Sequence, residues 1–181
     1  MMRSGSALVA IGFAWATQAV GAPALFPQRD VSVTYQTEQG GRVLEQQLRW
    51  SSKARRLRID PPAAGMFVLV DYAAHRMQIV RERDRSFTEM DAPASLPGLG
   101  APSAGRYTQG ADDRIAGLPC TEWTVATDGE PAGICVTPDG VLLRVRMGTR
   151  TVATASVVSY APQDVTLFRV PDGYARAVPP R

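Results

Sequence analysis

Apolar and polar residues alternate with a period of two along most of this 181-residue chain, and this pattern restricts its fold more than any other feature. Successive side chains of a β-strand point to opposite faces, so such alternation predicts strands with one buried face. The first run places Val31, Val33 and Tyr35 on one face, and the next run does the same for Leu48 and Trp50. A Gly-Gly pair between the two runs predicts a β-hairpin.

Further runs of this kind extend the pattern to about ten strands, and no long stretch after the N-terminus has the 3.6-residue period of a helix. Residues 66–72 are apolar on both faces, which is typical of a strand that is buried on both sides. Residues 91–105 are rich in Pro, Gly, Ala and Ser and predict a long surface loop within one domain. We predict a mainly β fold, a single curled antiparallel sheet that forms an unclosed barrel, with few or short helices.

The N-terminus has the composition of a secretory signal peptide. Arg3 supplies a positive charge, residues 7–20 are apolar, and the small residues Gly21 and Ala22 follow. This run is shorter than the roughly 20 residues that span a bilayer comfortably, although a retained membrane anchor is the alternative. From this signal we predict a periplasmic protein. We expect no lipid anchor, because no cysteine lies near the cleavage site. The expected parts are a signal (1–21), an extension (22–29), the domain (30–174) and a tail (175–181).

The chain has two cysteines, Cys120 and Cys135, and both lie in one short segment. In an oxidising compartment such a pair is most simply a disulfide. Alternation places both thiols opposite Trp123, on the polar side of a hairpin that turns at Asp128-Gly129. A two-residue turn would leave the cysteines one diagonal step apart, and we expect a bulge at Glu130-Pro131 to correct this. The spacing does not match a CxxC redox motif, and one histidine cannot complete a common zinc set.

Residues that could carry out catalysis are sparse. His75 is the single histidine and lies in an expected turn, yet a Ser-His-Asp triad would depend on it. Asp112 and Asp113 sit beside turn residues and lack the dense oxygen ligands of a calcium loop. The net charge is only +3, and acidic residues interrupt the arginine clusters, which disfavours nucleic-acid binding. We therefore assign no catalytic residue, metal ligand or cofactor and expect no enzyme; a hydrolase of unrecognised type is the alternative.

Three local patterns resemble a known family. They are VDYAAHRMQIVRERDRSFTEM, then IAGLPCTEWTV followed by GICVTPDGVLLRVRM, and finally LFRVPDGY. Together they resemble the DUF4412-type proteins of bacterial envelopes, which are similar to the LolA-like and LppX-like lipoprotein carriers. The resemblance covers about residues 30–174. It implies an unclosed antiparallel barrel, helices that cover its mouth, and acyl chains or lipid-modified proteins bound in an apolar concavity. Residues 92–105 offer little amphipathic helix for such a lid.

Two functions remain open at this point, and both are non-catalytic. In the first, the protein binds an apolar or acyl ligand, a lipid or a lipoprotein in the concave face of a half-barrel. In the second, it has a filled core without a small ligand and binds an envelope protein partner. A monomer is expected in either case. The residues predicted to line a ligand site are Tyr35, Leu48, Trp50, Leu57, Ile59, Phe67, Leu69, Met77, Trp123 and Val145.

Overall fold

The computed structural model describes residues 21–62, 65–92, 106–126 and 130–178, and its strands form one sheet of twelve. Nearly all of the proposed signal (1–21) and of the predicted loop at 91–105 lies outside these residues. One 3-10 helix, η1 (Val165–Phe168), is also present. The strands are β1 (Val31–Gln39), β2 (Arg42–Ser51), β3 (Arg56–Asp60), β4 (Met66–Asp71), β5 (Arg76–Arg81), β6 (Ser86–Asp91), β7 (Tyr107–Ile115), β8 (Leu118–Val125), β9 (Ala132–Val136), β10 (Leu142–Met147), β11 (Arg150–Ser159) and β12 (Ala175–Ala177).

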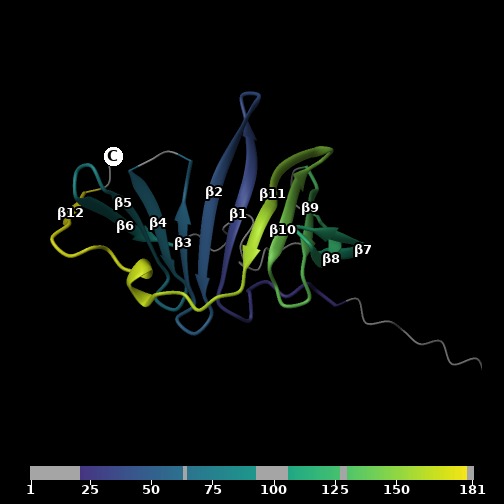
Figure 1. Cartoon of the computed structure of the whole chain (residues 1–181), viewed down its shortest axis with the longest axis horizontal. Helices are drawn as coiled ribbons and strands as arrows, with labels where there is room; N and C mark the ends of the chain where they lie inside the picture. Colours follow the sequence, from purple (N-terminus) through teal and green to yellow (C-terminus); the bar gives the residue numbers. More distant parts are fainter. Residues whose placement is uncertain (1–20, 63–64, 93–105, 127–129, 179–181) are drawn as a thin grey trace, which may run out of the picture.

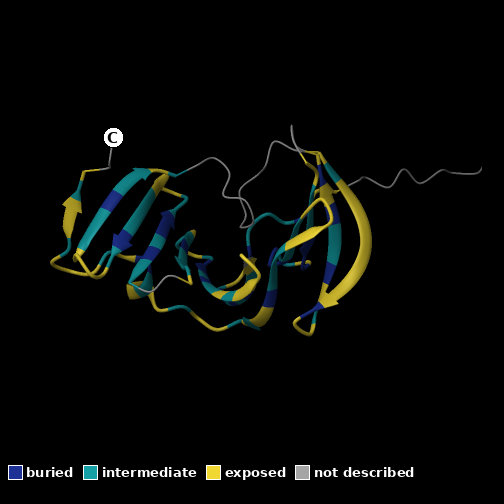
Figure 2. Cartoon of the chain, turned by 90° about the horizontal axis from the view of Figure 1, so that it is seen from above, coloured by how far each residue is buried: buried dark blue, intermediate teal, exposed yellow. Residues whose placement is uncertain are grey.

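The sheet is built from the centre outward in two meanders. The strand order is β12-β6-β5-β4-β3-β2-β1-β11-β10-β9-β8-β7. Strands β1 to β6 therefore lead from the centre towards one edge, and strands β7 to β11 lead from the other edge back to β1 (Figure 1). All neighbours pair antiparallel except β12, which pairs parallel to β6. Both flanks rise on the same side of the centre, which leaves one face concave (Figure 2). The predicted fold class, an unclosed and mainly antiparallel sheet, is confirmed.

Two of these strands were not expected from the sequence. β7 contains Asp112 and Asp113, for which the sequence predicts a place beside turns. That prediction was wrong because β7 is an edge strand with nearly every side chain exposed, so no alternation marks it. β12 spans only three residues and lies within the predicted tail, so the sheet extends beyond the predicted end of the domain.

Tight turns connect the first strands. The Gly-Gly pair joins β1 to β2 with φ of 57° and 74° at Gly40 and Gly41, as a two-residue hairpin requires. Four-residue turns follow β2, β4 and β5, and each ends in a residue other than glycine with a left-handed backbone. These residues are Arg55, His75 and Arg85, with φ of 51°, 52° and 45°. His75 is exposed in its turn, as predicted.

Replacing His75 with glycine should raise the free energy of unfolding by about 0.5 kcal/mol. The left-handed backbone strains a residue that has a Cβ by roughly 1–2 kcal/mol, and the flexibility of glycine in the unfolded chain offsets part of that gain. Urea unfolding followed by circular dichroism measures the change. His75→Ala keeps the strain and should be nearly neutral; a glycine variant no more stable than this alanine control would contradict the interpretation.

Three apolar clusters stabilise the sheet. The main cluster contains residues of β1 to β4 and of the flank formed by β7 to β11. Its members Val31, Val33 and Leu48 are at most 1% exposed. A second cluster lies on the outer face, where η1 and the chain after it cross the sheet (Figure 1). A third cluster of Trp123, Val136 and Leu142 lies on the flank that contains β8, β9 and β10. Among the described residues no α-helix covers the sheet, and burial on both of its faces contributes to its stability.

Candidate functional site

Four residues predicted to line a ligand site are buried in the main cluster. Tyr35, Leu48, Trp50 and Leu57 are between 1% and 4% exposed. The strand registers align Val33 with Leu48 and Trp50 with Leu57, so these side chains share the concave face. Two further predicted residues, Ile59 and Met77, are partly buried against the same cluster. These six residues thus share one face of the sheet, and their role in lining a ligand site stays a prediction.

Trp123 and Val145 continue the concave face on the other flank. Trp123 pairs with Ile134, which pairs with Val145, and that residue pairs with Ala153 opposite β1. Directly paired residues of neighbouring strands point to the same face. Trp123 is 8% exposed and belongs to the third cluster. The concave face is thus apolar on both flanks.

Phe67 and Leu69 do not belong with these residues, and their placement among the interior residues was wrong. β4 pairs Val68 and Val70 with Ile59 and Leu57, which directs Phe67 and Leu69 to the outer face. There they form the second cluster with Val80, covered by Val170 and Tyr174. A strand that is apolar on both faces carries no local signal for which face is concave, and only its pairing decides this.

An aromatic cluster fills one end of the concave face. The ring of Phe26 stacks on Trp50 with 5.5 Å between centroids, and Tyr72 meets both rings edge-on. The indole Nε1 of Trp50 donates to the carbonyl oxygen of Pro27 at 2.9 Å. Burial raises the pKa of Tyr72 to about 12. The N-terminal extension therefore contributes to the core of the domain.

The buried hydroxyl of Tyr35 also has a partner within the chain. It donates to the carbonyl oxygen of Leu142 at 2.7 Å, and burial raises the pKa of this tyrosine. A buried polar group that is already hydrogen-bonded does not need a ligand to satisfy it. The interior polar atoms of Tyr35 and Trp50 thus connect elements of the fold.

Asp30 links three segments that are distant in sequence. Its carboxylate accepts hydrogen bonds from the backbone N–H and the hydroxyl of Ser52, at 2.8 and 2.9 Å, and from the N–H of Gln163 at 3.0 Å. Burial opposes the charge of Asp30, but the hydrogen bonds outweigh it and lower its pKa. The carboxylate therefore connects the start of β1, the β2–β3 turn and the segment after β11.

Asp30→Asn should make the stability of the protein less dependent on pH in the acid range. A lowered pKa in the folded state means that the carboxylate stabilises the protein above its ordinary pKa near 3.8, and that this contribution disappears as the pH falls through the folded value. The difference in unfolding free energy between wild type and variant should be largest near neutral pH and shrink below pH 4. Urea titrations from pH 2.5 to 7 test this; a difference that does not vary with pH would refute it.

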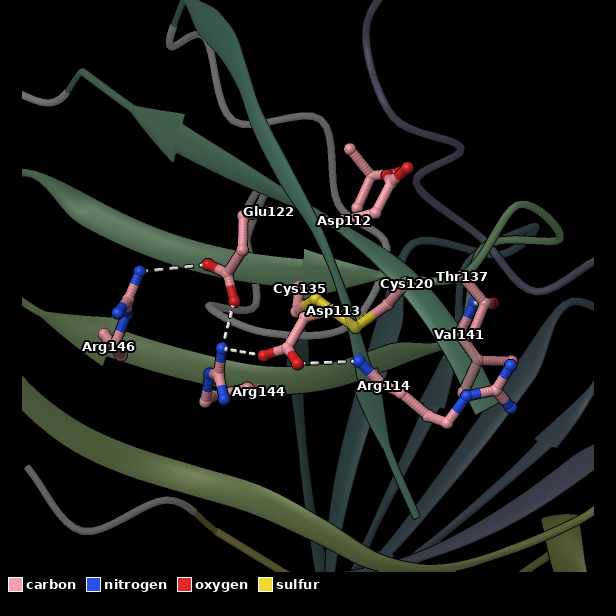
Figure 3. Close-up of a disulfide and its surroundings, with 11 residues drawn as sticks. Asp112, Asp113, Arg114, Cys120, Glu122, Cys135, Thr137, Val141, Arg144 and Arg146 are labelled. Atoms are coloured by element: carbon pink, nitrogen blue, oxygen red, sulfur yellow. Dashed lines mark hydrogen bonds and ion pairs between the residues drawn. A yellow bond between two sulfur atoms is a disulfide. The ribbon is translucent and has the colours of Figure 1, made fainter. Parts of the chain in front are cut away.

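The disulfide predicted between Cys120 and Cys135 is present and joins β8 to β9 (Figure 3). Glu122, not Cys120, is paired with Cys135, so the cysteines lie on a diagonal with Cα atoms 5.5 Å apart. The register runs without a bulge from Thr121 to Val125, so the correcting bulge expected at Glu130-Pro131 is absent from the described ladder, and the predicted turn lies outside the described residues. A diagonal pair is already close enough for a disulfide.

The surroundings of the disulfide are less polar than predicted. Cys120 and Cys135 are 2% and 0% exposed and belong to the main apolar cluster. Alternation did place them on the same face as Glu122 and Arg144. The far end of this face is apolar because a bulge between Leu142 and Arg144 shifts the register of β10.

Charged side chains form a network over the disulfide (Figure 3). Arg144 donates to Asp113 at 2.6 Å and also to Glu122, which accepts from Arg146 at 3.0 Å. The N–H of Arg114 and the Arg144 guanidinium lower the pKa of Asp113. Two guanidinium groups balance two carboxylates here, so we interpret this network as structural.

The clefts on the surface of the described structure include the following three. The first, of about 230 Å³, lies on the outer face of the sheet against the C-terminal segment, and Leu69 lines it. The other two, of about 360 and 370 Å³, flank the side chains of Arg29 and Tyr160 near the N-terminal extension. Leu69 is the one predicted lining residue that borders any of these three clefts.

Two features are absent from the described residues. No group of histidine, cysteine or acidic residues among them is arranged to hold a metal ion. None of the helices in the described ranges has the length and apolar character needed to cross a membrane.

Comparison with known proteins identifies similar structures and no similar sequence. No family model matches the chain, and no curated protein matches its sequence. An uncharacterized conserved protein from Thermus thermophilus superposes with a TM-score of 0.62 at 10% identity, over 84% of this chain and 91% of that protein. The Pseudomonas aeruginosa MucA/MucB complex gives 0.56 at 14% identity, over 81% of this chain and 57% of the matched chain.

PNGF-II gives a TM-score of 0.56 at 10% identity, with 83% of this chain but only 32% of PNGF-II covered. This chain therefore spans little more than half of the matched chain in the MucA/MucB complex and about a third of PNGF-II. Identities this low establish a shared fold and no more.

Proposed function

We propose that this chain is an exported, non-catalytic protein of the bacterial envelope that binds a partner protein through its outer surface. The observation that carries this proposal is the burial of Tyr35, Leu48, Trp50 and Leu57, each at most 4% exposed. A small-molecule site is a cleft of about 300–1,000 Å³ that leaves its lining side chains accessible to the ligand. These four side chains instead pack against their own chain. This favours the second of the two predicted functions, the interaction module, over the first, the binding of an acyl ligand.

The fold comparison supports the same proposal. MucB shares this fold and has been crystallised in complex with MucA(peri). A similar use of the fold here would make the partner another protein. Membership of the DUF4412-type or LolA-like proteins belongs to this proposal as well, because those proteins are expected to have an unclosed antiparallel barrel.

A periplasmic location is part of the proposal and has two sources of support. The N-terminal sequence has the features of a secretory signal. The disulfide between Cys120 and Cys135 is typical of an oxidising compartment.

Native mass spectrometry of the protein, purified from its own periplasm without detergent, tests the proposal. We expect the mass of the oxidised polypeptide, about 2 Da below the reduced form, with no stoichiometric lipid. Crosslinking before lysis should then yield a defined protein partner that rebinds after separate purification. A stoichiometric acyl or phospholipid adduct would overturn the proposal in favour of ligand binding in the concave face.

A further inference from the structure

The C-terminal strap, which we define as residues 161–177, crosses the outer face of the sheet and forms one wall of a cleft (Figure 1). Phe168 anchors it and is 5% exposed, and the guanidinium of Arg58 donates to the carbonyl oxygen of Leu167 at 3.2 Å. Beyond η1 the strap ends in β12, which pairs with β6. The cleft therefore has a fixed wall as well as a rigid floor of β-strands.

The floor of this cleft is apolar and its rim is cationic. Leu69, Phe87, Phe168 and Val170 supply the apolar surface. Arg56 and Arg76 come from the row of paired residues that runs across β3, β4 and β5, and Arg169 comes from the strap. These three arginines face one acidic residue of the lining, Asp71.

Arg56 and Arg76, the two arginines on the sheet, have N–H donors that make no hydrogen bond to a described residue. Arg56 uses only Nε, at 2.9 Å from Asp71, and its two terminal nitrogens have no hydrogen bond to any described residue. Arg76 lies 3.8 Å from Glu89, beyond hydrogen-bonding distance, and its side chain is 52% exposed. Asp71 also accepts from the N–H of Ala74 at 2.9 Å, so its charge is already engaged. An incoming carboxylate would find planar guanidinium donors suited to bidentate binding.

We propose that this cleft recognises an acidic segment of the partner protein, with a carboxylate against Arg56 and Arg76 and a neighbouring apolar side chain against Leu69 and Phe168. The inference rests on the proposed function and specifies the chemistry of the partner. The excess of positive charge selects an acidic group. The volume of about 230 Å³ is below the range of small-molecule sites, which suits one or two side chains better than a lipid.

The test uses the full chain, labelled with ¹⁵N, and two peptides. The probe is acetyl-Gly-Phe-Glu-Phe-Gly-amide, and its counterpart carries Gln in place of Glu. We expect the amide signals of Leu69, Gln78, Phe87 and Val170 to shift with the Glu peptide. The Gln peptide should bind about tenfold more weakly, since it lacks the charge that strengthens hydrogen bonds to arginine. Added salt should also weaken the binding of the Glu peptide, because these arginines are partly exposed and salt screens exposed charges.

A double variant, Arg56→Gln with Arg76→Gln, should bind the Glu peptide about tenfold more weakly than the wild type does. The melting temperature of the variant protein should stay close to that of the wild type. The matched control is Arg49→Gln, which removes an arginine from the same face outside the cleft. Its ion-pair partner Asp60 retains Arg58 at 2.7 Å, so folding should be preserved. Affinity for the peptide should then be unchanged.

Several results would overturn the inference. Equal binding of the Glu and Gln peptides would remove its electrostatic basis, and shifts confined to another surface would relocate the site. Phosphatidylglycerol vesicles that bind the wild type but not the double variant, without peptide binding, would reassign the cleft to lipid headgroups. If a crosslinked partner binds the double variant as tightly as wild type, the inference fails while the proposed function stands. A stoichiometric lipid in the native protein would instead overturn the proposed function itself.

Discussion

Replacing Trp50 with alanine should lower the free energy of unfolding by about 3–5 kcal/mol. Its indole is 3% exposed, stacks on Phe26 and meets Tyr72 at 5.8 Å. The substitution removes these contacts, leaves a cavity, and deprives the carbonyl oxygen of Pro27 of its donor. A domain of this size is stable by only about 5–15 kcal/mol, so this single change removes a large fraction of that stability.

Equilibrium unfolding in urea measures this loss. It is followed by circular dichroism of the backbone, and not by the fluorescence of the tryptophan that is replaced. Val157→Ala is the matched control, because Val157 is 58% exposed and truncating it should change stability by less than about 0.5 kcal/mol. The Trp50 result also separates the two functions. If the alanine variant keeps nearly wild-type stability but loses a bound lipid, Trp50 lines a ligand site rather than a packed core.

Removing the disulfide, by Cys120→Ala together with Cys135→Ala, should cost about 3 kcal/mol. The bond closes a loop with a sequence separation of 15, and in the chain-entropy model this restricts the unfolded state by roughly that amount. Both sulfur atoms are also buried in the main cluster, so the smaller alanine side chains lose apolar contacts. The expected effect is therefore at least as large as the loop term.

Dithiothreitol provides the control for this prediction. Reduction of the wild type should lower its unfolding midpoint towards that of the double variant, and the variant itself should not respond to the reductant. A wild-type midpoint that is unchanged under full reduction would show that the bond contributes little. A variant that loses stability while reduced wild type does not would assign the effect to side-chain packing.

Local patterns in the sequence were sufficient for the hairpins and for one face of the sheet. The Gly-Gly turn and the alternation at Leu48 and Trp50 each depend on neighbouring residues only. The two cysteines fell on one side of a hairpin by the same argument, and the structure pairs them. Such features can be predicted because turn chemistry and side-chain alternation operate over a few residues.

The candidate cleft could not be predicted in this way. Arg56, Arg76 and Phe168 are distant in sequence and meet because β3, β4 and β5 pair in register and the C-terminal strap crosses them. No local signal distinguishes an arginine beside an apolar cleft from one on a plain solvated face. For the strap itself the sequence predicts only the end of the domain and a tail, since its short strand has too few residues to show a period.

By itself, the sequence determined that the chain forms strands, where many of them turn, and that Cys120 and Cys135 can be joined. Tertiary structure alone decided that Phe67 and Leu69 face outward, that β7 is an edge, and that Trp50 is enclosed by the N-terminal extension. The physical reason is the range of the interactions. Alternation and turns arise from contacts between neighbours, whereas the choice between two apolar faces depends on which distant segments come to cover each of them.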